Sequence, residues 1–457
     1  MADLVADRPV PNRLQAVIDG APITAMQWTT IVLCGLVMFL DGFDTQAISY
    51  IAPAIAREWH VERSLLGPIF SAALFGLMAG YLLLSPLSDR FGHRRMVIWA
   101  SLGFALATLA CAFAGDVTTL MVLRFLTGIG LGAATPSAVA LTGEYSPRRF
   151  RASFVLAIYC GFSLGFVAAG IATNVLLEAH GWRALLIAGA IPSFVLAPFL
   201  IAALPEAITT LTRRGADRSR ALATLHRLDP QLTASDLAAR SDGAAAGDRA
   251  PLRRLFSGGL AVGTLVLWGV FFVNLAEFYA LQSWLPTILH DLNYPGSTVV
   301  MATALTTVGG IAAAFVVGPA MDRIDAYGAL ATLYAVGVVF TGLVGLALAG
   351  PPTLLMATTF LAGFCISGGQ KSVISLAALY YPAEIRSTGV GWALGIGRLG
   401  GIAGPLVAGL ALTAGLAPAA VFYLLAALMV PMAAAIAYLG YRYMADVRKK
   451  PVAARAG

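Results

Sequence analysis

Charged residues are scarce in this 457-residue chain, because Asp, Glu, Lys and Arg together make up only 12% of it. A water-soluble globular protein carries roughly 25% charged residues. The hydrophobic fraction of 59% and the mean hydropathy of +0.81 leave too little polar surface for a soluble particle. The composition therefore excludes an ordinary soluble domain and indicates an integral membrane protein.

Cysteine and histidine are also rare, and each shortage excludes a class of site. The four cysteines form no C-x-x-C pair, so neither a disulfide framework nor a metal site is expected. The five histidines lie in expected loops or at span ends without a nucleophile beside them, so we expect neither an enzyme nor a cofactor. Arginines occur in short clusters between apolar runs, so no nucleic-acid partner is expected. The N-terminus lacks the basic-then-apolar pattern of a cleaved signal peptide.

What the chain does contain is twelve long apolar runs, each near the roughly 20 residues that a membrane-crossing helix needs. They lie at 27–50, 64–86, 95–115, 117–141, 152–177, 183–204, 258–286, 297–320, 327–349, 353–379, 388–413 and 419–443. Long continuous runs favour helices over the short alternating strands of a barrel. We therefore expect an all-α integral membrane fold with twelve transmembrane helices.

The polar segments divide these helices into two groups of six. We expect a tail at 1–26, a six-helix bundle at 27–206, a central loop at 207–257, a second bundle at 258–445 and a tail at 446–457. The central loop is either a plain linker or a regulatory surface. Arg and Lys gather in the loops on the side of both termini, so both ends should face the cytoplasm. A multi-pass protein of the bacterial inner membrane, acting as a monomer, is expected.

Two pairs of loop motifs indicate an internal repeat. Asp89-Arg90 after the second run and Asp322-Arg323 after the eighth are 233 positions apart. A Pro-x-x-x-Arg motif ends at Arg151 after the fourth run and at Arg386 after the tenth, 235 positions later. Two matched motifs at nearly one offset predict two related halves, with a substrate site between them near mid-membrane.

These motifs resemble those of the major facilitator superfamily of transporters. SPLSDRFGHRR (85–95) matches its loop pattern G-x-L-x-D-R-x-G-R-[RK]-[RK], with departures at Ser85 and His93. RFLTGIGLG (124–132) and LPEAITTL (204–211) resemble its motifs in the fourth span and at the end of the sixth. The resemblance covers essentially the whole chain and implies two six-helix bundles that rock around a central site.

A narrower resemblance points to the aromatic acid:proton symporters, of the type that transports 4-hydroxybenzoate and protocatechuate. LDGFDTQA (40–47) resembles their D-G-x-D signature, and SWLPTIL (283–289) and RSTGVGWALGIGRLGGIAGP (386–405) resemble two further segments. The resemblance implies import of a small aromatic carboxylate with protons. A proton-driven exporter, or an importer of another small organic anion, is the alternative; the absence of proline from GFSLGFVAAG (161–170) favours import.

Ionisable residues inside the spans are few, and lipid disfavours each by about 2.5–3.5 kcal/mol unless it faces a cavity or a partner. Asp41 and Asp44 share one face of the first helix. Burial and a nearby like charge both disfavour the ionised form of a carboxyl group. The pair is therefore predicted to couple transport to protons, with a structural hydrogen-bonding pair as the alternative. Glu277 in the seventh span is a rival proton carrier.

An anionic substrate requires a cation, and three basic side chains are candidates. Arg398 lies among glycines, and its planar guanidinium suits a carboxylate; the resemblance also implies a functional Arg there. A gating ion pair is the alternative for Arg398, and snorkelling toward the interface is the alternative for Lys371. Arg124 would pair with Asp41 or Asp44, either to tune their proton affinity or as a fixed structural pair.

Further residues are predicted to line the site or to gate it. The substrate-binding candidates besides these cations are Asn274, Phe278, Gln282, Trp284, Gln370 and Tyr159. The gating candidates, which would form ion pairs in the inner loops, are Asp89, Arg90, Glu144, Arg148, Arg151, Asp322, Arg323, Glu384 and Arg386. The alternative for the aromatic residues is core packing. The alternative for the loop arginines is that they only set the orientation of the spans.

Overall fold

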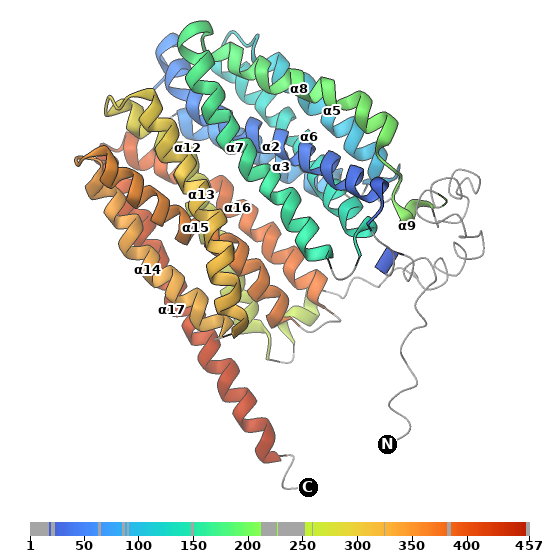
Figure 1. Cartoon of the computed structure of the whole chain (residues 1–457). Coiled ribbons are helices and arrows are strands. Elements are labelled where there is room, and N and C mark those ends of the chain that lie inside the picture. The colour runs from blue at the N-terminus through green and yellow to red at the C-terminus, as the bar shows by residue number, and fades with distance from the viewer. Residues whose placement is uncertain are drawn as a thin grey trace.

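The computed structural model is built from long helices that lie side by side (Figure 1). It describes residues 18–19, 23–62, 65–84, 87–88, 91–147, 150–211, 226, 252–257, 259–323, 325–381 and 385–453. The N-terminal half contains α2 (Ala25–Glu58), α3 (Leu66–Leu83), α5 (His93–Cys111), α6 (Val117–Tyr145), α7 (Arg151–His180) and α8 (Trp182–Ala203). The C-terminal half contains α12 (Ala261–Asp291), α13 (Gly296–Arg323), α14 (Ala326–Ala347), α15 (Pro352–Tyr380), α16 (Arg386–Thr413) and α17 (Pro418–Ala453). The short helix α9 (Ile208–Leu211) follows the N-terminal half, and the short helix η2 (Leu252–Phe256) precedes the C-terminal half.

These helices have the properties of membrane spans. Within the described ranges, eleven are long and apolar enough to cross a bilayer, and α3 adds the shorter apolar segment Leu66–Tyr81. Large apolar side chains such as Trp99, Phe113 and Phe315 are exposed on the outside of the molecule, as lipid contact allows. A helix satisfies its own backbone hydrogen bonds, which a span in lipid requires. The predicted all-α membrane fold is confirmed.

Several helix ends are fixed by side chains that the sequence places there. Thr24 caps α2 in a capping box with Gln27. Asp116 precedes α6 and accepts a hydrogen bond from the backbone N–H of Thr119 at 2.9 Å. Hydrogen bonds from the side chain and backbone of Thr119 lower the pKa of the Asp116 carboxyl group. Such caps satisfy backbone donors that the first turn leaves free.

Several helices are longer than the apolar runs suggest: α17 continues to Ala453, through part of the predicted tail, and two others continue through a proline. α2 continues through Pro53 to Glu58, and α12 continues through Pro286 to Asp291. The expected ends were residues 50 and 286, because the apolar runs stop there. Neighbouring helices satisfy the backbone groups that a proline frees within a span, so these prolines do not end their helices.

The packing of the two halves repeats, as the loop motifs predict. α2 packs on α7 and α3 on α6, and in the C-terminal half α12 packs on α16 and α13 on α15. Gly76 of α3 lies against the backbone carbonyl of Phe125, and Gly309 of α13 lies against that of Phe360. The two glycines are 233 positions apart and the two phenylalanines 235 positions apart. Glycine is required at both positions because a side chain would collide with the facing carbonyl. These offsets show which residue of the C-terminal half corresponds to each residue of the N-terminal half.

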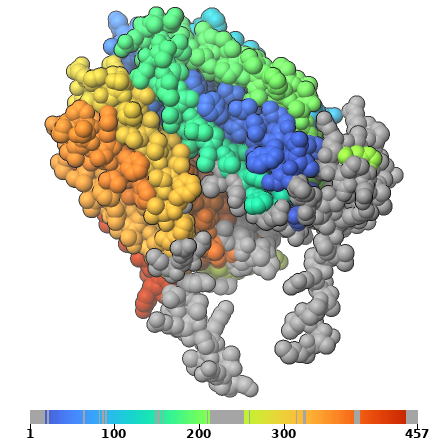
Figure 2. Space-filling model, in the orientation of Figure 1, coloured from blue at the N-terminus to red at the C-terminus, as the bar shows by residue number. Residues whose placement is uncertain are grey.

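Within the part of the chain that the structure describes, the halves meet mainly where α2 packs on α12, α3 on α16 and α7 on α13. Figure 2 shows them as two adjoining lobes, blue to green and yellow to orange. We name the end of the bundle that holds the start of α2 and the end of α17 the inner end, and the opposite end the outer end. Most of the predicted central loop, including the segment RSRALATLHRL (218–228), lies outside the described residues.

Contacts between the halves close the outer end of the molecule. Arg57 of α2 donates a hydrogen bond to His290 of α12, with 3.0 Å between Nη2 and Nε2. The side-chain amide of Gln46 donates to the backbone carbonyl of Gln282 at 3.3 Å. Ser71 of α3 donates to the backbone carbonyl of Ile402 in α16 at 3.0 Å. The space between the halves therefore lies on the inner side of these contacts.

Candidate functional site

A cavity of about 350 Å³ lies between the two halves, near the middle of the helices. This volume is in the range of small-molecule binding sites, roughly 300–1,000 Å³. Both halves contribute to its wall, from α2, α3, α6 and α7 on one side and from α12, α13, α15 and α16 on the other. A central site between two repeats is the arrangement that the sequence repeat predicts.

Asp41 of α2 is the acidic side chain of this cavity wall among the described residues. Its Oδ2 accepts a hydrogen bond from Thr135 of α6 at 2.8 Å, and its Oδ1 accepts one from Thr45 at 3.3 Å. Neither partner is charged, so the carboxylate is held in place by neutral donors. Among the described residues, its two hydrogen-bond partners at the cavity wall are thus neutral hydroxyl groups.

Asp44, one helical turn further along α2, has a different environment. It forms an ion pair with Arg124 of α6, with 2.8 Å between Oδ2 and Nη1, and both side chains are almost completely buried. Thr108 of α5 donates to its other oxygen at 2.8 Å, and Arg124 also donates to its backbone carbonyl at 3.3 Å. The predicted pairing of Arg124 with one of the two aspartates is thus found with Asp44.

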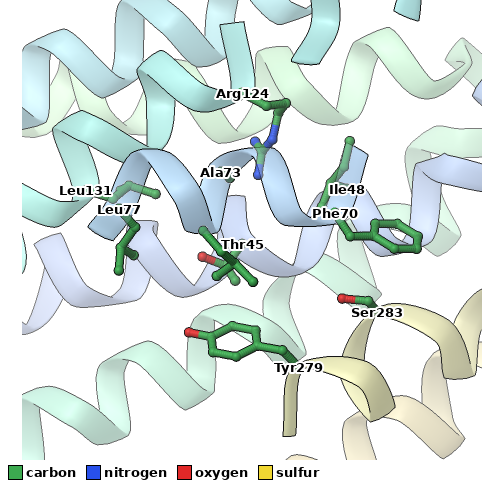
Figure 3. A pocket seen from close by; sticks show the side chains of 10 residues that line it. Thr45, Ile48, Phe70, Ala73, Leu77, Arg124, Leu131, Tyr279 and Ser283 are labelled. Atoms are coloured by element: carbon green, nitrogen blue, oxygen red, sulfur yellow. The ribbon is translucent and has the colours of Figure 1, made fainter. Parts of the chain in front are cut away.

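Arg124 does not reach the central cavity, although the sequence suggests it as a substrate contact. Its guanidinium points from α6 toward a separate void of about 20 Å³, beside Thr45 and Tyr279 (Figure 3). A space of this size holds about one water molecule. Arg124 is therefore a buried partner of Asp44, because the acid on the neighbouring helix holds it away from the cavity wall.

Arg398 of α16 is the principal cation of the cavity. Its Nη1 donates to the hydroxyl of Tyr279 at 3.1 Å, and its Nη2 donates to the hydroxyl of Tyr81, also at 3.1 Å. The guanidinium also lies over the ring of Tyr81, 5.0 Å from its centroid. Arg398 is close enough to Asp41 to act on it electrostatically. Tyr81 comes from the N-terminal half, so Arg398 spans the boundary between the halves.

Lys371 of α15 also lines the cavity and is half-buried. Its Nζ donates to the backbone carbonyl of Gly310 in α13 at 3.3 Å, and no described acidic side chain lies within ion-pair distance of it. Gln370, Ser367 and Ser375 line the cavity on the same helix. Snorkelling toward the membrane interface was the alternative for Lys371, but its Nζ lies at the cavity wall beside Gly310.

Aromatic rings form much of the remaining wall. Phe162 and Phe166 of α7 lie with ring centroids 4.8 Å apart, and Phe166 is 6.2 Å from Phe278 of α12. Tyr159 lines the cavity on the same helix as Phe162. These rings form a face that crosses the boundary between the halves, and offset or edge-on aromatic contacts with a ligand ring are favourable by about 0.5–1.5 kcal/mol each.

The substrate-binding candidates predicted on α12 lie only partly at the cavity. Phe278 lines it, but Asn274, Gln282 and Trp284 are buried against other helices. Asn274 donates to the backbone carbonyl of Ile366 at 3.1 Å, Gln282 donates to the hydroxyl of Thr307 at 3.2 Å, and Trp284 donates to the backbone carbonyl of Pro405 at 2.9 Å. α12 has neighbours on several sides, so a single polar stripe does not define its cavity face. Glu277 is also buried away from the cavity wall.

The gating candidates lie mostly beyond what the structure describes. Asp89, Arg90, Arg148 and Glu384 lie outside the described residues. Arg151, Asp322, Arg323 and Arg386 belong to the described helices, but their side chains lie outside the described set. Glu144 lies in the last turn of α6. Glu206, from the segment LPEAITTL, accepts a hydrogen bond from the backbone N–H of Arg94 at 3.3 Å and so caps the start of α5.

Several residues of the site give no signal in the sequence. Tyr81, Tyr279, Thr135 and Phe166 lie on four different helices, and only the packing of these helices brings them to one cavity. Tyrosine and threonine in a span usually pack against neighbouring helices, and only the tertiary structure shows which of them reach a cavity. Tyr279 follows Phe278 directly, but it is not among the substrate-binding candidates predicted from the sequence.

The comparison with protein families decides the identity of the fold. The model of the Major Facilitator Superfamily matches residues 34–325 and 267–456. The chain belongs to this superfamily. The matched ranges together cover nearly all of the twelve long helices, in agreement with the family resemblance of the loop motifs.

Curated relatives within the superfamily are aromatic-acid transporters by name. The 4-hydroxybenzoate transporter PcaK of Pseudomonas aeruginosa is 40% identical over 87% of this chain and 89% of that protein. The gallate transporter of Pseudomonas putida is 39% identical over 92% of this chain and 93% of its own length. The benzoate transport protein of Acinetobacter baylyi is 29% identical over 86% of this chain and 85% of its own. These relatives are named as transporters, which confirms the expectation of a transporter rather than an enzyme.

Solved structures agree with the fold. The inward-open xylose transporter XylE of Escherichia coli matches with a TM-score of 0.71, over 90% of this chain and 95% of that one, at 16% sequence identity. At this identity the likeness concerns the fold alone. It supports the two-bundle architecture independently of hydropathy.

Proposed function

We propose that this protein imports aromatic carboxylates of the hydroxybenzoate class together with protons. The names and identities of its relatives support the substrate class, because three of them transport 4-hydroxybenzoate, gallate or benzoate by name. The observation that carries the proposal is that Asp41, Arg398 and an aromatic face line one cavity. Each of these features suits one part of the transported species: the proton, the carboxylate and the ring.

The substrate carboxylate binds to Arg398 in this proposal. The hydroxyls of Tyr81 and Tyr279 hold two nitrogens of the guanidinium at 3.1 Å, so the side chain is fixed before the ligand arrives. A fixed planar guanidinium suits a carboxylate, since charge-assisted hydrogen bonds of this kind are strong and directional. The ring then lies against Phe162, Phe166 and Phe278, where offset contacts stabilise it.

The second polar region of the cavity accounts for the ring hydroxyls. Gln370 and Lys371 of α15 line it together with Ser375, and Lys371 reaches toward α13 while Arg398 reaches toward α3 and α12. A donor-rich wall opposite a carboxylate site favours a ring that bears hydroxyl groups over a bare one. An apolar wall there would leave those hydroxyls without partners.

Proton coupling follows from competition for Arg398. When Asp41 is ionised, its charge and that of Arg398 compensate each other across the cavity. When Asp41 binds a proton, Arg398 loses that compensation and attracts a second carboxylate, that of the substrate. The two bound species therefore favour each other, which is the thermodynamic requirement of symport. Asp44 has Arg124 as a permanent partner at 2.8 Å, so we assign the exchanged proton to Asp41.

Alternating access completes the proposed cycle. The outer contacts of Arg57 with His290 and of Ser71 with Ile402 separate when the halves rock around the cavity, as in other transporters built from repeats. The bias of Arg and Lys toward the inner loops assigns the inner end to the cytoplasm of a bacterial inner membrane, with both termini inside. The monomer contains the whole cavity, so we propose that one chain is the functional unit.

Uptake of radiolabelled 4-hydroxybenzoate into proteoliposomes tests the proposal. An inward proton gradient is expected to drive accumulation, and collapse of the gradient with a protonophore is expected to abolish it. A binding panel of benzoate, 4-hydroxybenzoate, protocatechuate and gallate is expected to favour the hydroxylated rings. Uptake that does not respond to the gradient contradicts coupling, and accumulation driven by an outward gradient indicates an exporter.

A further inference from the structure

The side chain of Glu277 on α12 is completely buried and has no described partner. Its exposed fraction is 0%, and neither carboxylate oxygen has a hydrogen-bond partner among the described residues. An ionised carboxylate taken from water into such surroundings costs so much free energy that the group becomes neutral instead. The geometry of the site therefore requires a bound proton on Glu277.

The internal repeat places Glu277 at the position that the acid of the ion pair occupies in the other half. Glu277 is 233 positions after Asp44, the offset that relates Gly76 to Gly309. Thr359 is 235 positions after Arg124, the offset that relates Phe125 to Phe360. The C-terminal half thus keeps an acid at the position of Asp44 but has a neutral residue where the N-terminal half has the arginine.

The groups around Glu277 supply no compensating charge. Tyr334 of α14 acts on it electrostatically and is itself fully buried with an unpartnered hydroxyl. The described basic side chains on the spans that pack against α12 are Lys371 and Arg398, together with Arg442 in the last turns of α17 and Arg57 at the outer end of α2, which donates to His290. Lys371 donates to Gly310 and Arg398 to two tyrosines, so neither of them neutralises Glu277.

Access to Glu277 also differs from access to Asp41. Asp41 lines the central cavity, from which a proton can reach water, whereas Glu277 is not part of that wall. A transported proton has to leave on the inner side, and the outer end is closed in this conformation. A proton on Glu277 has no such exit here.

We propose that Glu277 is a second proton-binding site, occupied by a resident proton that stays with the C-terminal half throughout transport. The neutral acid fills the position that an ion pair fills in the other half. Its consequence for transport rests on the proposed function: only the proton of Asp41 moves with the substrate, so one proton accompanies one monoanion. The transported charge is then zero.

Infrared spectroscopy of the membrane-reconstituted protein tests the bound proton directly. The wild-type protein is expected to show the C=O stretching band of a protonated carboxylic acid at neutral and at alkaline pH, insensitive to added 4-hydroxybenzoate. Glu277→Gln is expected to lose this band, while Asp41→Asn keeps it. Loss of an ionised carboxylate band in Glu277→Gln overturns the proposal. If Glu277→Gln does not fold, absence of an alkali-resistant acid band from the wild-type spectrum overturns it equally.

Transport tests whether the proton is resident or carried. A potassium diffusion potential without a pH gradient is expected to leave wild-type accumulation at the equilibrium level, because no net charge moves. Glu277→Gln is expected to accumulate 4-hydroxybenzoate under a pH gradient to the wild-type ratio. Accumulation that follows the potential in wild-type protein but not in Glu277→Gln shows a carried proton and contradicts residence. If 4-hydroxybenzoate is not transported at all, the proposed function fails, and the infrared result alone decides the state of Glu277.

Discussion

The two halves have matching backbones but opposite charges at the cavity. Asp41 of α2 corresponds to Asn274 of α12, 233 positions later, so the acid belongs to the N-terminal half alone. Arg398 of α16 corresponds to Ser163 of α7, 235 positions earlier, so the cation belongs to the C-terminal half alone. In the proposed function the two halves therefore differ in role: the N-terminal half holds the exchangeable proton and the C-terminal half holds the carboxylate site.

The same contrast continues one helical turn deeper. Asp44 is paired with Arg124 and accepts a hydrogen bond from Thr108. Glu277 at the matching position has no partner among the described residues. A buried acid is thus tolerated in two ways, with a permanent counter-ion or with a bound proton. An acid in a span is therefore not by itself evidence of an exchangeable proton.

The largest expected effect on transport is that of Asp41→Asn, compared with a change at the matched residue Asn274, because coupling to the gradient is lost completely. Asp41→Asn removes the exchangeable proton, so gradient-driven accumulation is expected to fall to simple equilibration. A pH difference of one unit is worth about 1.4 kcal/mol, roughly tenfold in accumulation, and this ratio should drop to one. Asn274→Ala, the matched control, should keep the gradient response. Undiminished accumulation by Asp41→Asn would show that Asp41 does not hold the exchanged proton.

The next effect concerns the buried pair. Arg124→Leu leaves Asp44 without its counter-ion, which is expected to destabilise the folded protein by about 3–5 kcal/mol, measured as a loss of thermal stability in detergent. Adding Asp44→Asn should restore much of the loss. A single variant as stable as the wild type would show that the pair is dispensable.

The third effect tests the cation of the C-terminal half. Arg398→Gln is expected to weaken 4-hydroxybenzoate binding by at least about 2 kcal/mol, roughly thirtyfold, because a desolvated carboxylate loses its charged donor. Ser163→Ala at the matched position should change affinity by no more than about twofold. Equilibrium binding to the purified protein measures both. If Arg398→Gln binds normally, the carboxylate site lies at Lys371 instead.

A smaller effect on stability than that of the buried pair is expected for two threonines at matched positions. Thr108 donates to the charged Asp44 at 2.8 Å, whereas Thr341, 233 positions later, contacts only the sulfur of Met429 at 3.6 Å. Thr108→Val is expected to cost about 1.5–3 kcal/mol of stability, as for a hydrogen bond to a charged group. Thr341→Val should cost clearly less. Equal losses in thermal stability would mean that the two environments are more alike than the contacts indicate.

Most of the fold and part of the candidate site can be predicted from the sequence. Hydropathy predicts every long helix, because lipid requires continuous apolar runs, but it misses the ends of α2 and α12, where helices continue through Pro53 and Pro286. Ionisable residues in spans indicate Asp41, Arg398 and Lys371, which line the cavity. Spacing on one helix does not show which face meets a cavity.

The residues that sequence reasoning misses are those whose position depends on several helices at once. Tyr81 and Tyr279 hold Arg398 from α3 and α12, and neither residue type stands out in an apolar span. Conversely, Arg124 stands out by its charge but is held at Asp44 by the packing of α6 on α2. Charge thus identifies candidates, and tertiary packing decides which of them reach the substrate.

The central claim is that the substrate and a proton on Asp41 bind together. Titration calorimetry of 4-hydroxybenzoate in two buffers of different ionisation enthalpy counts the protons that binding takes up. The wild-type protein is expected to take up about one proton per substrate at a pH where Asp41 is ionised, with affinity rising as the pH falls. Asp41→Asn should bind the substrate without proton uptake and with little pH dependence. Binding to the wild type without proton uptake, or equal uptake by Asp41→Asn, would contradict the account.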